Sequence, residues 1–313
     1  MDIFYFFLGL VLLLLGGDFL VKGSVALAIR MRVSMVVIGL TVVSFATSAP
    51  ELIVSVYSAL TGHPDMAIGN VIGSNIANIS LVLGLTALVY PLSFKKRLYQ
   101  FDIPVMLTAC VLFAIFLFTN ALLEAWEGFV FIVMLGLLTL YLIQKSRKQE
   151  LLSKEVHVDS VSLFKLSFYL VSGGTFLYFG SHFLVNGASG LAREIGLSER
   201  IISVSIVAFG TSVPELAASI IAALKKQKDL SIGNLIGSNI FNVLAVLGIT
   251  SIVKPIAVLD ESLITNDIWW MLGISVLLYP LMFLFKKDHF GRVEGLVLLM
   301  VYTIYIYFIL IFI

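Results

Sequence analysis

The chain has 313 residues, of which 60% are hydrophobic and only 12% are charged, and its formal net charge is +1. Soluble domains average about 45–50% apolar and about 25% charged residues. The composition therefore excludes a soluble globular enzyme, a disordered protein and a nucleic-acid binder, which would need a basic patch. The single cysteine excludes a disulfide framework and a cysteine-based metal site. What remains is an all-α polytopic membrane protein.

A helix needs about 20 mostly apolar residues to cross the hydrocarbon core of a bilayer. Ten stretches meet this requirement, so we expect ten transmembrane helices. They are 3–29, 36–60, 66–90, 101–119, 125–144, 164–192, 200–224, 230–253, 266–285 and 293–312. The first cannot be a cleaved signal peptide, because no basic segment precedes it and its apolar run is too long.

The basic residues indicate how the spans are oriented, because Lys and Arg gather in cytoplasmic loops. Alternate loops carry 17 of the 20 basic residues, whereas the opposite side carries only Arg193, Arg200 and Lys254. Both termini should therefore face outside. The loop at 145–163 should face the cytoplasm, and it is too short to form a domain.

An internal repeat occurs at a constant offset of 164 residues. Residues 36–84 align without gaps to 200–248, with 24 of 49 positions identical. T-S-A-P-E-L at 47–52 matches T-S-V-P-E-L at 211–216, and I-G-N-V-I-G-S-N-I at 68–76 matches I-G-N-L-I-G-S-N-I at 232–240. Each half contains five predicted spans, an odd number, so the second half should enter the membrane from the opposite side. This predicts an inverted-topology repeat, as in many secondary transporters. The five-helix halves are 1–144 and 164–313.

Glu51 and Glu215 are equivalent by the offset, and each lies deep in a predicted span. An ionised carboxylate at mid-membrane costs at least about 2.5 kcal/mol, so both residues are candidates for a functional site. Alternatively, they are protonated or hydrogen-bonded packing residues. Pro50 and Pro214 directly precede them. Because proline lacks a backbone donor and disrupts the preceding turn, we expect both helices to be broken there, with freed carbonyls.

Polar side chains accompany each glutamate. Thr47 and Ser48 stand four and three residues before Glu51, so all three can share one helix face. Thr211 and Ser212 stand in the same way before Glu215. Hydroxyls of this kind could instead bond back to their own helix or join neighbouring helices.

The second motif, G-N-x-x-G-S-N-x-x-N, places further polar residues on one helix face. Ser74 and Asn78 are four residues apart, and Asn70 extends the stripe. Ser238, Asn242 and Asn234 repeat the pattern, and we expect the G-x-x-x-G glycines to allow close packing. All these donors are oxygen atoms, which favour hard cations such as Ca²⁺ and Na⁺ over Zn²⁺. Two carboxylates could be balanced by one Ca²⁺ or by two monovalent ions.

These motifs resemble the repeats of the cation/calcium exchanger superfamily, particularly prokaryotic sodium/calcium exchangers, over nearly the whole chain. The resemblance implies Na⁺/Ca²⁺ antiport by alternating access in the plasma (inner) membrane of a prokaryote, with Ca²⁺ export driven by the Na⁺ gradient. It implies neither enzymatic activity nor a cofactor, and no obligatory protein partner is evident. The predicted spans 3–29 and 164–192 would slide across a fixed core.

The resemblance also implies ligands. The calcium site would use Glu51 and Glu215 with the carbonyls of Thr47 and Thr211. The sodium sites would use Thr47, Ser48, Ser74, Thr211, Ser212 and Ser238, with backbone carbonyls of Ser44 and Ala208, around the central amides Asn78 and Asn242. Ala46 departs from the family, which usually has Gly there. Asn242 stands where related exchangers often have Asp, which weakens any case for K⁺ dependence.

Other functions stay open. The same fold could couple Ca²⁺ to H⁺, since two glutamates could bind two protons. An intramembrane hydrolase and a passive cation channel are more distant alternatives. Asp18 and His182, equivalent by the offset, form either hydrogen bonds at and between helices or a gate or proton sensor. Asp65 and Asp229, also equivalent, should be helix N-caps.

Overall fold

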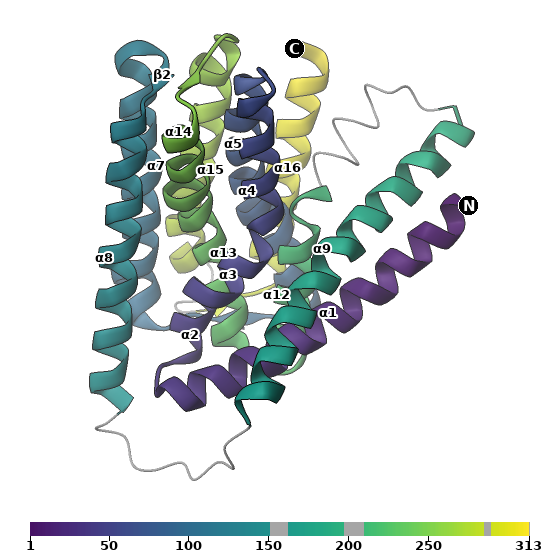
Figure 1. The fold of residues 1–313 in the computed structure, drawn as a ribbon, viewed down its shortest axis with the longest axis vertical. Coiled ribbons are helices and arrows are strands. Elements are labelled where there is room, and N and C mark those ends of the chain that lie inside the picture. Colours follow the sequence, from purple (N-terminus) through teal and green to yellow (C-terminus); the bar gives the residue numbers. More distant parts are fainter. Residues whose placement is uncertain (151–161, 197–209, 285–288, 313) are drawn as a thin grey trace. The chain divides into compact units, whose positions relative to one another are not determined.

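The computed structural model describes residues 1–150, 162–196, 210–284 and 289–312, and these residues are almost entirely helical (Figure 1). Eight helices in this part of the chain are long and apolar enough to cross a membrane. A ninth span results if the helices on either side of a 46° bend, Met35–Thr47 and Ala49–Leu60, are counted together. The first part of the predicted span 200–224 lies outside the described residues. The chain is therefore a multi-pass helical membrane protein.

The helices agree with the expected spans to within several residues at each end. In the first half they are α1 (Asp2–Met31), α2 (Met35–Ile38), α3 (Ser44–Thr47), α4 (Ala49–Leu60), α5 (Pro64–Ala77), α6 (Gly84–Val89), α7 (Ile103–Asn120) and α8 (Ala125–Glu150). In the second half they are α9 (Leu163–Glu194), α12 (Val213–Leu224), α13 (Lys228–Phe241), α14 (Gly248–Val253), α15 (Ile268–Leu284) and α16 (Arg292–Phe312). Because α8 continues to Glu150, the predicted loop at 145–163 begins as helix.

Short π-helical segments interrupt several spans, which the sequence did not predict. They are η1 (Gly39–Val43), η2 (Asn78–Leu83), η3 (Leu98–Asp102), η5 (Asn242–Leu247) and η6 (Leu263–Asp267). The segments η2 and η5 are separated by the repeat offset of 164, and each begins at a predicted ligand, Asn78 or Asn242. Such π-bulges are rare and frequently lie at functional sites.

Four two-residue strands add to a fold that was predicted to be all-α. β1 (Leu92–Ser93) pairs antiparallel with β4 (His289–Phe290), and β2 (Leu122–Leu123) pairs antiparallel with β3 (Ile256–Ala257). Each pair joins a loop of the first half to a loop of the second half. The strands therefore link the two halves of the sequence without changing the helical character of the protein.

The chain divides into two compact units, which we describe separately. Unit 1 contains Met1–Thr47 and Leu138–Leu235, and unit 2 contains Ser48–Leu137 and Ile236–Ile313. Each unit takes segments from both predicted five-helix halves. The boundaries fall directly after Thr47 and after Leu235, inside the two repeated motifs.

In unit 1, α1 and α9 run antiparallel along a seam of glycines. A Cβ added to Gly16 would lie 2.7 Å from the Leu177 backbone nitrogen, and one added to Gly180 would lie 2.9 Å from that of Leu13. These two contacts are the same contact seen from each repeat, because 16 and 180, like 13 and 177, differ by 164. Gly173 likewise packs against the Leu20 backbone. Glycine allows this because its missing side chain lets the two backbones approach closely.

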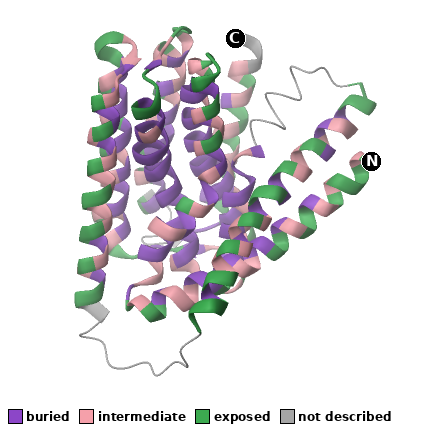
Figure 2. Ribbon diagram, viewed as in Figure 1, coloured by how far each residue is buried: buried purple, intermediate pink, exposed green. Residues whose placement is uncertain are grey.

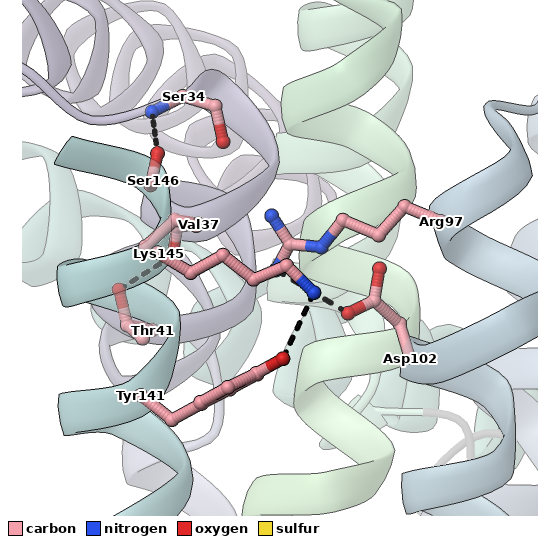
Figure 3. A network of polar contacts seen from close by, with 8 residues as sticks. All are labelled: Ser34, Val37, Thr41, Arg97, Asp102, Tyr141, Lys145 and Ser146. Carbon is pink, nitrogen blue, oxygen red and sulfur yellow. Dashed lines mark hydrogen bonds and ion pairs between the residues drawn. The ribbon is translucent and has the colours of Figure 1, made fainter. Parts of the chain in front are cut away.

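The C-terminal part of α8 also belongs to unit 1, where it is tied to the segment between α1 and α2. The Ser34 amide donates a hydrogen bond to Ser146 Oγ at 2.7 Å, and on the same helix Lys145 Nζ donates to Tyr141 Oη (Figure 3). In unit 2, Arg97 forms an ion pair of 3.4 Å with the buried Asp102 at the start of α7 (Figure 3). The Ser34 contact ties α8 to the residue before α2, and the Arg97 contact lies at the start of α7.

The spans that carry the second motif are the most buried of the candidate spans (Figure 2). In Pro64–Val89, 78% of the most apolar stretch is buried, and in Lys228–Val253 the share is 83%, compared with 22–44% in the other single-helix spans. Both contain many polar residues, so their polar side chains face protein rather than lipid. Burial of this kind is typical of functional polar residues in membrane proteins.

Candidate functional site

Both glutamates lie at the start of a helix that follows a break. Ser48 precedes α4 with φ −87° and ψ 8°, and Pro50 stands in the first turn. Ser212 precedes α12 with φ −87° and ψ 1°, and Pro214 stands in its first turn. The 46° bend confirms the predicted interruption before Glu51. In the second repeat α12 begins at Val213 with Pro214 in its first turn, where proline is tolerated, and most of the predicted span before it lies outside the described residues.

The position of the glutamates has an electrostatic consequence. Glu51 and Glu215 both lie in the first turn and have no solvent-exposed surface. The first backbone N–H groups of a helix lack partners within it, and they carry a partial positive charge that stabilises a nearby carboxylate. A helix start can thus hold a buried negative charge that the middle of an unbroken helix could not.

Unit 2 brings predicted ligands from both repeats together. Here α4 packs against α5 and η5. Asn242, the first residue of η5, donates from Nδ2 to Ser74 Oγ of α5 at 2.9 Å. The predicted ligands of unit 2 are Ser48, Glu51, Ser74, Asn78, Ser238 and Asn242, and at most 3% of each is exposed.

Several oxygen atoms of unit 2 lack a hydrogen-bond partner among the described residues. They include Asn242 Oδ1 and Asn78 Oδ1, whose residues are fully buried. A buried polar atom without a partner costs about 1–3 kcal/mol. A bound cation would satisfy amide oxygens of this kind, because Ca²⁺ and Na⁺ take amide and carbonyl oxygens as ligands.

Unit 1 contains Glu215 and the remaining predicted ligands. Thr47 Oγ1 donates to Asn234 Oδ1 at 3.1 Å, and Ser44 Oγ lies 3.1 Å from the Asn234 carbonyl oxygen and 2.8 Å from that of Gly39. Ser212 is fully buried, whereas Thr211 is half-buried. Ala208 lies outside the described residues.

Two asparagines that were placed on the polar stripe without a role make specific contacts. In unit 2, Asn70 Nδ2 donates to the Glu51 carbonyl oxygen at 3.2 Å and to Ser55 Oγ at 2.9 Å. In unit 1, Asn234 Nδ2 donates to the Glu215 carbonyl oxygen at 3.4 Å and to Ser219 Oγ at 2.9 Å. Their shared offset was the available sequence signal, but their partners could be identified only from the fold.

Other expectations have mixed outcomes. The close packing expected of the motif glycines occurs at Gly233, where an added Cβ would lie 2.6 Å from the Val36 carbonyl oxygen. It does not occur at Gly73, where nothing lies within 4 Å of an added Cβ. The N-cap prediction for Asp65 is wrong, since the N-cap position of α5 is His63, whose side chain makes no capping hydrogen bond. Asp65 instead lies in the first turn and accepts a hydrogen bond from the Leu259 amide at 2.7 Å.

The offset pair in α1 and α9 makes the hydrogen bonds expected within and between helices. Asp18 accepts from Lys22 on its own helix at 2.7 Å and also pairs with Lys225 at the end of α12. His182 forms a 3.0 Å hydrogen bond with Asn186. The two equivalent positions therefore make different contacts: Asp18 forms ion pairs with two lysines, whereas His182 forms a hydrogen bond with an amide on its own helix.

The chemistry of the site is that of oxygen ligands. Among the described residues, no cluster of three or more His, Cys, Asp or Glu side chains could hold a metal ion. The predicted ligands are instead carboxylate, hydroxyl, amide and carbonyl oxygens, a set that suits hard cations. A cavity of about 430 Å³ lies elsewhere in unit 2 and is lined by none of the predicted ligands. Its lining includes Trp269, Trp270, Gly273 and Val301.

Comparison with known proteins gives the family. The model of the family described as sodium/calcium exchanger protein matches residues 1–144 and 165–311. CaxA of Alkalimonas amylolytica is 38% identical over 306 residues, covering 96% of this chain and 95% of the relative. The sodium/calcium exchanger MaX1 of Methanosarcina acetivorans is 30% identical over 338 residues, with coverage of 96% and 95%.

A solved structure of a sodium–calcium exchanger has the same fold as this chain. The sodium–calcium exchanger NCX_Mj, soaked with 2.5 mM Na⁺ and 0.1 mM Sr²⁺, superposes with a TM-score of 0.81 at 33% sequence identity. The match covers 98% of this chain and 99% of the exchanger. The family model and these matches lead to one conclusion: the chain belongs to the sodium/calcium exchanger protein family.

Proposed function

We propose that this protein is a secondary active antiporter that exports Ca²⁺ in exchange for Na⁺ across the plasma (inner) membrane of a prokaryote. The observation that carries the proposal is the burial of Glu51 and Glu215, each in the first turn of a helix that follows a break. Two carboxylates carry a charge near −2, which either one Ca²⁺ or two Na⁺ can balance. Ions that compete to neutralise one site provide the physical basis of exchange.

The proposed ligands are those that the resemblance to the family implies. Ca²⁺ binds Glu51 and Glu215 with the carbonyl oxygens of Thr47 and Thr211. Na⁺ binds the hydroxyl-bearing positions of both repeats, and the central amides complete the set. The Na⁺ ligands are Thr47, Ser48, Ser74, Thr211, Ser212 and Ser238, with the carbonyls of Ser44 and Ala208 and the amides of Asn78 and Asn242. The unpartnered amide oxygens of unit 2 support this assignment.

The proposed topology has ten transmembrane helices in two five-helix repeats of inverted orientation, 1–144 and 164–313, joined by 145–163, with both termini outside. The antiparallel course of α1 and α9 supports the inversion, because equivalent helices of inverted repeats must cross the membrane in opposite directions. The distribution of Lys and Arg supports the orientation.

The test is ion flux in liposomes that contain the purified protein. We expect ⁴⁵Ca²⁺ uptake to follow an imposed Na⁺ gradient and to be absent with a pH gradient alone. Uptake that follows only the pH gradient would replace Na⁺ by H⁺ as the coupling ion. Downhill Ca²⁺ flux that needs no counter-ion would instead identify a passive channel.

A further inference from the structure

The side chain of Asn234 joins polar groups from both repeats within unit 1. It lies on α13 and only 1% of the residue is exposed. Its Nδ2 atom donates to the Glu215 carbonyl oxygen and to Ser219 Oγ on α12. Its Oδ1 atom accepts from Thr47 Oγ1 on α3, at 3.1 Å. One amide therefore connects α12, which carries a proposed Ca²⁺ ligand, to α3, which carries a proposed Na⁺ ligand.

The direction of these hydrogen bonds follows from the chemistry of the groups. A backbone carbonyl can only accept a hydrogen bond, so the amide nitrogen of Asn234 must face the Glu215 carbonyl and its oxygen must face Thr47. A threonine hydroxyl has one hydrogen and two lone pairs. The Thr47 hydroxyl has two acceptors in reach, Asn234 Oδ1 at 3.1 Å and the Ser44 carbonyl oxygen at 3.4 Å, and Asn234 is the nearer. When the hydroxyl donates to Asn234, its lone pairs point away from the amide and can bind a cation.

We propose that Asn234 is a positioning residue that turns the Thr47 hydroxyl so that its lone pairs face Na⁺. Asn234 acts through Thr47 and does not itself bind the ion. The inference rests on the proposed function, because it assumes that the Thr47 hydroxyl is a Na⁺ ligand. Ca²⁺ binding depends chiefly on the carboxylates, so Asn234 selectively strengthens Na⁺ binding.

Asn70 makes the first part of this arrangement in unit 2, where its Nδ2 holds the Glu51 carbonyl and Ser55. The bond from the amide to the glutamate carbonyl is therefore a property of both repeats. In unit 1 the same orientation of the amide leaves Oδ1 to receive the Thr47 hydrogen. The bond that orients the Asn234 amide is therefore present in both repeats.

The test is a double-mutant cycle on ⁴⁵Ca²⁺ exchange in liposomes, with half-saturating Na⁺ and Ca²⁺ concentrations measured separately. A hydrogen bond of this kind contributes about 0.5–1.5 kcal/mol, so Asn234→Ala should raise the half-saturating Na⁺ concentration roughly two- to tenfold. The half-saturating Ca²⁺ concentration should change less. Thr47→Val, which removes the hydroxyl, should raise the Na⁺ value by at least as much.

The double variant Asn234→Ala/Thr47→Val should be no worse for Na⁺ than Thr47→Val alone, because Asn234 then has no hydroxyl to orient. Additive effects on Na⁺, or equal losses of Na⁺ and Ca²⁺ affinity, would overturn the proposal. Ser219→Ala is the matched control, since it removes another partner of Asn234 but leaves Thr47 in place, and it should not change the ratio of the two values.

Asn234→Gln keeps the amide but displaces it by one methylene, and it replaces Asn234→Ala in the cycle if that variant does not fold. The wild type separates this inference from the proposed function. If the wild type shows no Na⁺-dependent Ca²⁺ flux, the proposed function is wrong and the role of Asn234 falls with it. If the wild type is Na⁺-dependent and the cycle is additive, only the role of Asn234 is wrong.

Discussion

The starts of α4 and α12 are two copies of one local structure that lie in different polar surroundings. Both follow a serine with φ −87° and ψ near zero, both have proline in the first turn, and both bury a glutamate completely. The asparagine that holds the glutamate carbonyl differs more, because Asn70 is half-buried and Asn234 is 1% exposed. The groups nearest the glutamates thus match closely, whereas the supporting groups differ between the copies.

This comparison shows which features are kept in both copies of the repeat. A broken helix with a buried carboxylate is costly unless an ion or a hydrogen-bond donor compensates it, so both copies keep the arrangement that reduces the cost. The supporting hydrogen bonds are individually worth only about 0.5–1.5 kcal/mol and can diverge without loss of the fold. Substitutions in each copy test whether the two are equivalent in function as well as in geometry.

The largest effect is expected from the glutamates. Glu51→Gln and Glu215→Gln should each abolish ⁴⁵Ca²⁺ exchange, because removal of one charge from a buried ionic site costs about 3–5 kcal/mol, or more than a hundredfold in affinity. Liposome flux measured over a range of Ca²⁺ concentrations checks this. Equal losses would indicate one shared site; a variant that keeps full activity would show that the two copies differ in function.

Two other buried glutamates provide the matched control. Glu127 accepts a hydrogen bond from the Glu124 amide at 2.8 Å, and Glu294 accepts one from the Gly291 amide at 2.8 Å. Each lies in the first turn of its helix, α8 or α16, and at most 3% of each is exposed. Glutamine can still accept these bonds, so Glu127→Gln and Glu294→Gln should leave exchange active.

A smaller effect is expected in the glycine seam of unit 1. Gly16→Ala and Gly180→Ala should each destabilise the protein by about 1–3 kcal/mol, because the new methyl group meets the backbone of the facing helix. Thermal unfolding of the purified protein in detergent measures this. Gly136→Ala on α8 is the control, because nothing lies within 4 Å of its added Cβ. Similar losses of stability at Gly16 and Gly180, which are equivalent by the offset of 164, would show that the two sides of the seam contribute equally.

The smallest effect is expected at the ion-pair network of Asp18. The side chains of Asp18, Lys22 and Lys225 are 29%, 48% and 33% exposed, and partly exposed ion pairs contribute only about 0.2–1 kcal/mol. Asp18→Asn should therefore lower the melting temperature slightly, and the difference should shrink in 1 M salt because of screening. His182→Ala, at the equivalent position, should show no such dependence on salt, because it removes a hydrogen bond to the neutral amide of Asn186. A salt-independent loss at Asp18 would point to packing instead.

The sequence predicts what depends on local chemistry. Apolar length places the spans, and proline places the breaks before Glu51 and Glu215, because these effects act within one or two helical turns. It does not predict the π-helical segments that begin at Asn78 and Asn242, nor the strand pairs, because both depend on distant parts of the chain. The bond between Thr47 and Asn234 spans 187 positions, so neither motif contains a signal for it.

The glycine seam between α1 and α9 has the symmetry of a homodimer interface within one polypeptide. Because Gly16 meets Leu177 as Gly180 meets Leu13, the surface of each helix complements its own copy. A half-length chain with this surface could pair with a second molecule inserted in the opposite orientation, and one substitution would then alter the interface twice. In the present chain each contact can vary alone, so covalent fusion of the halves permits the two sides of the seam to diverge.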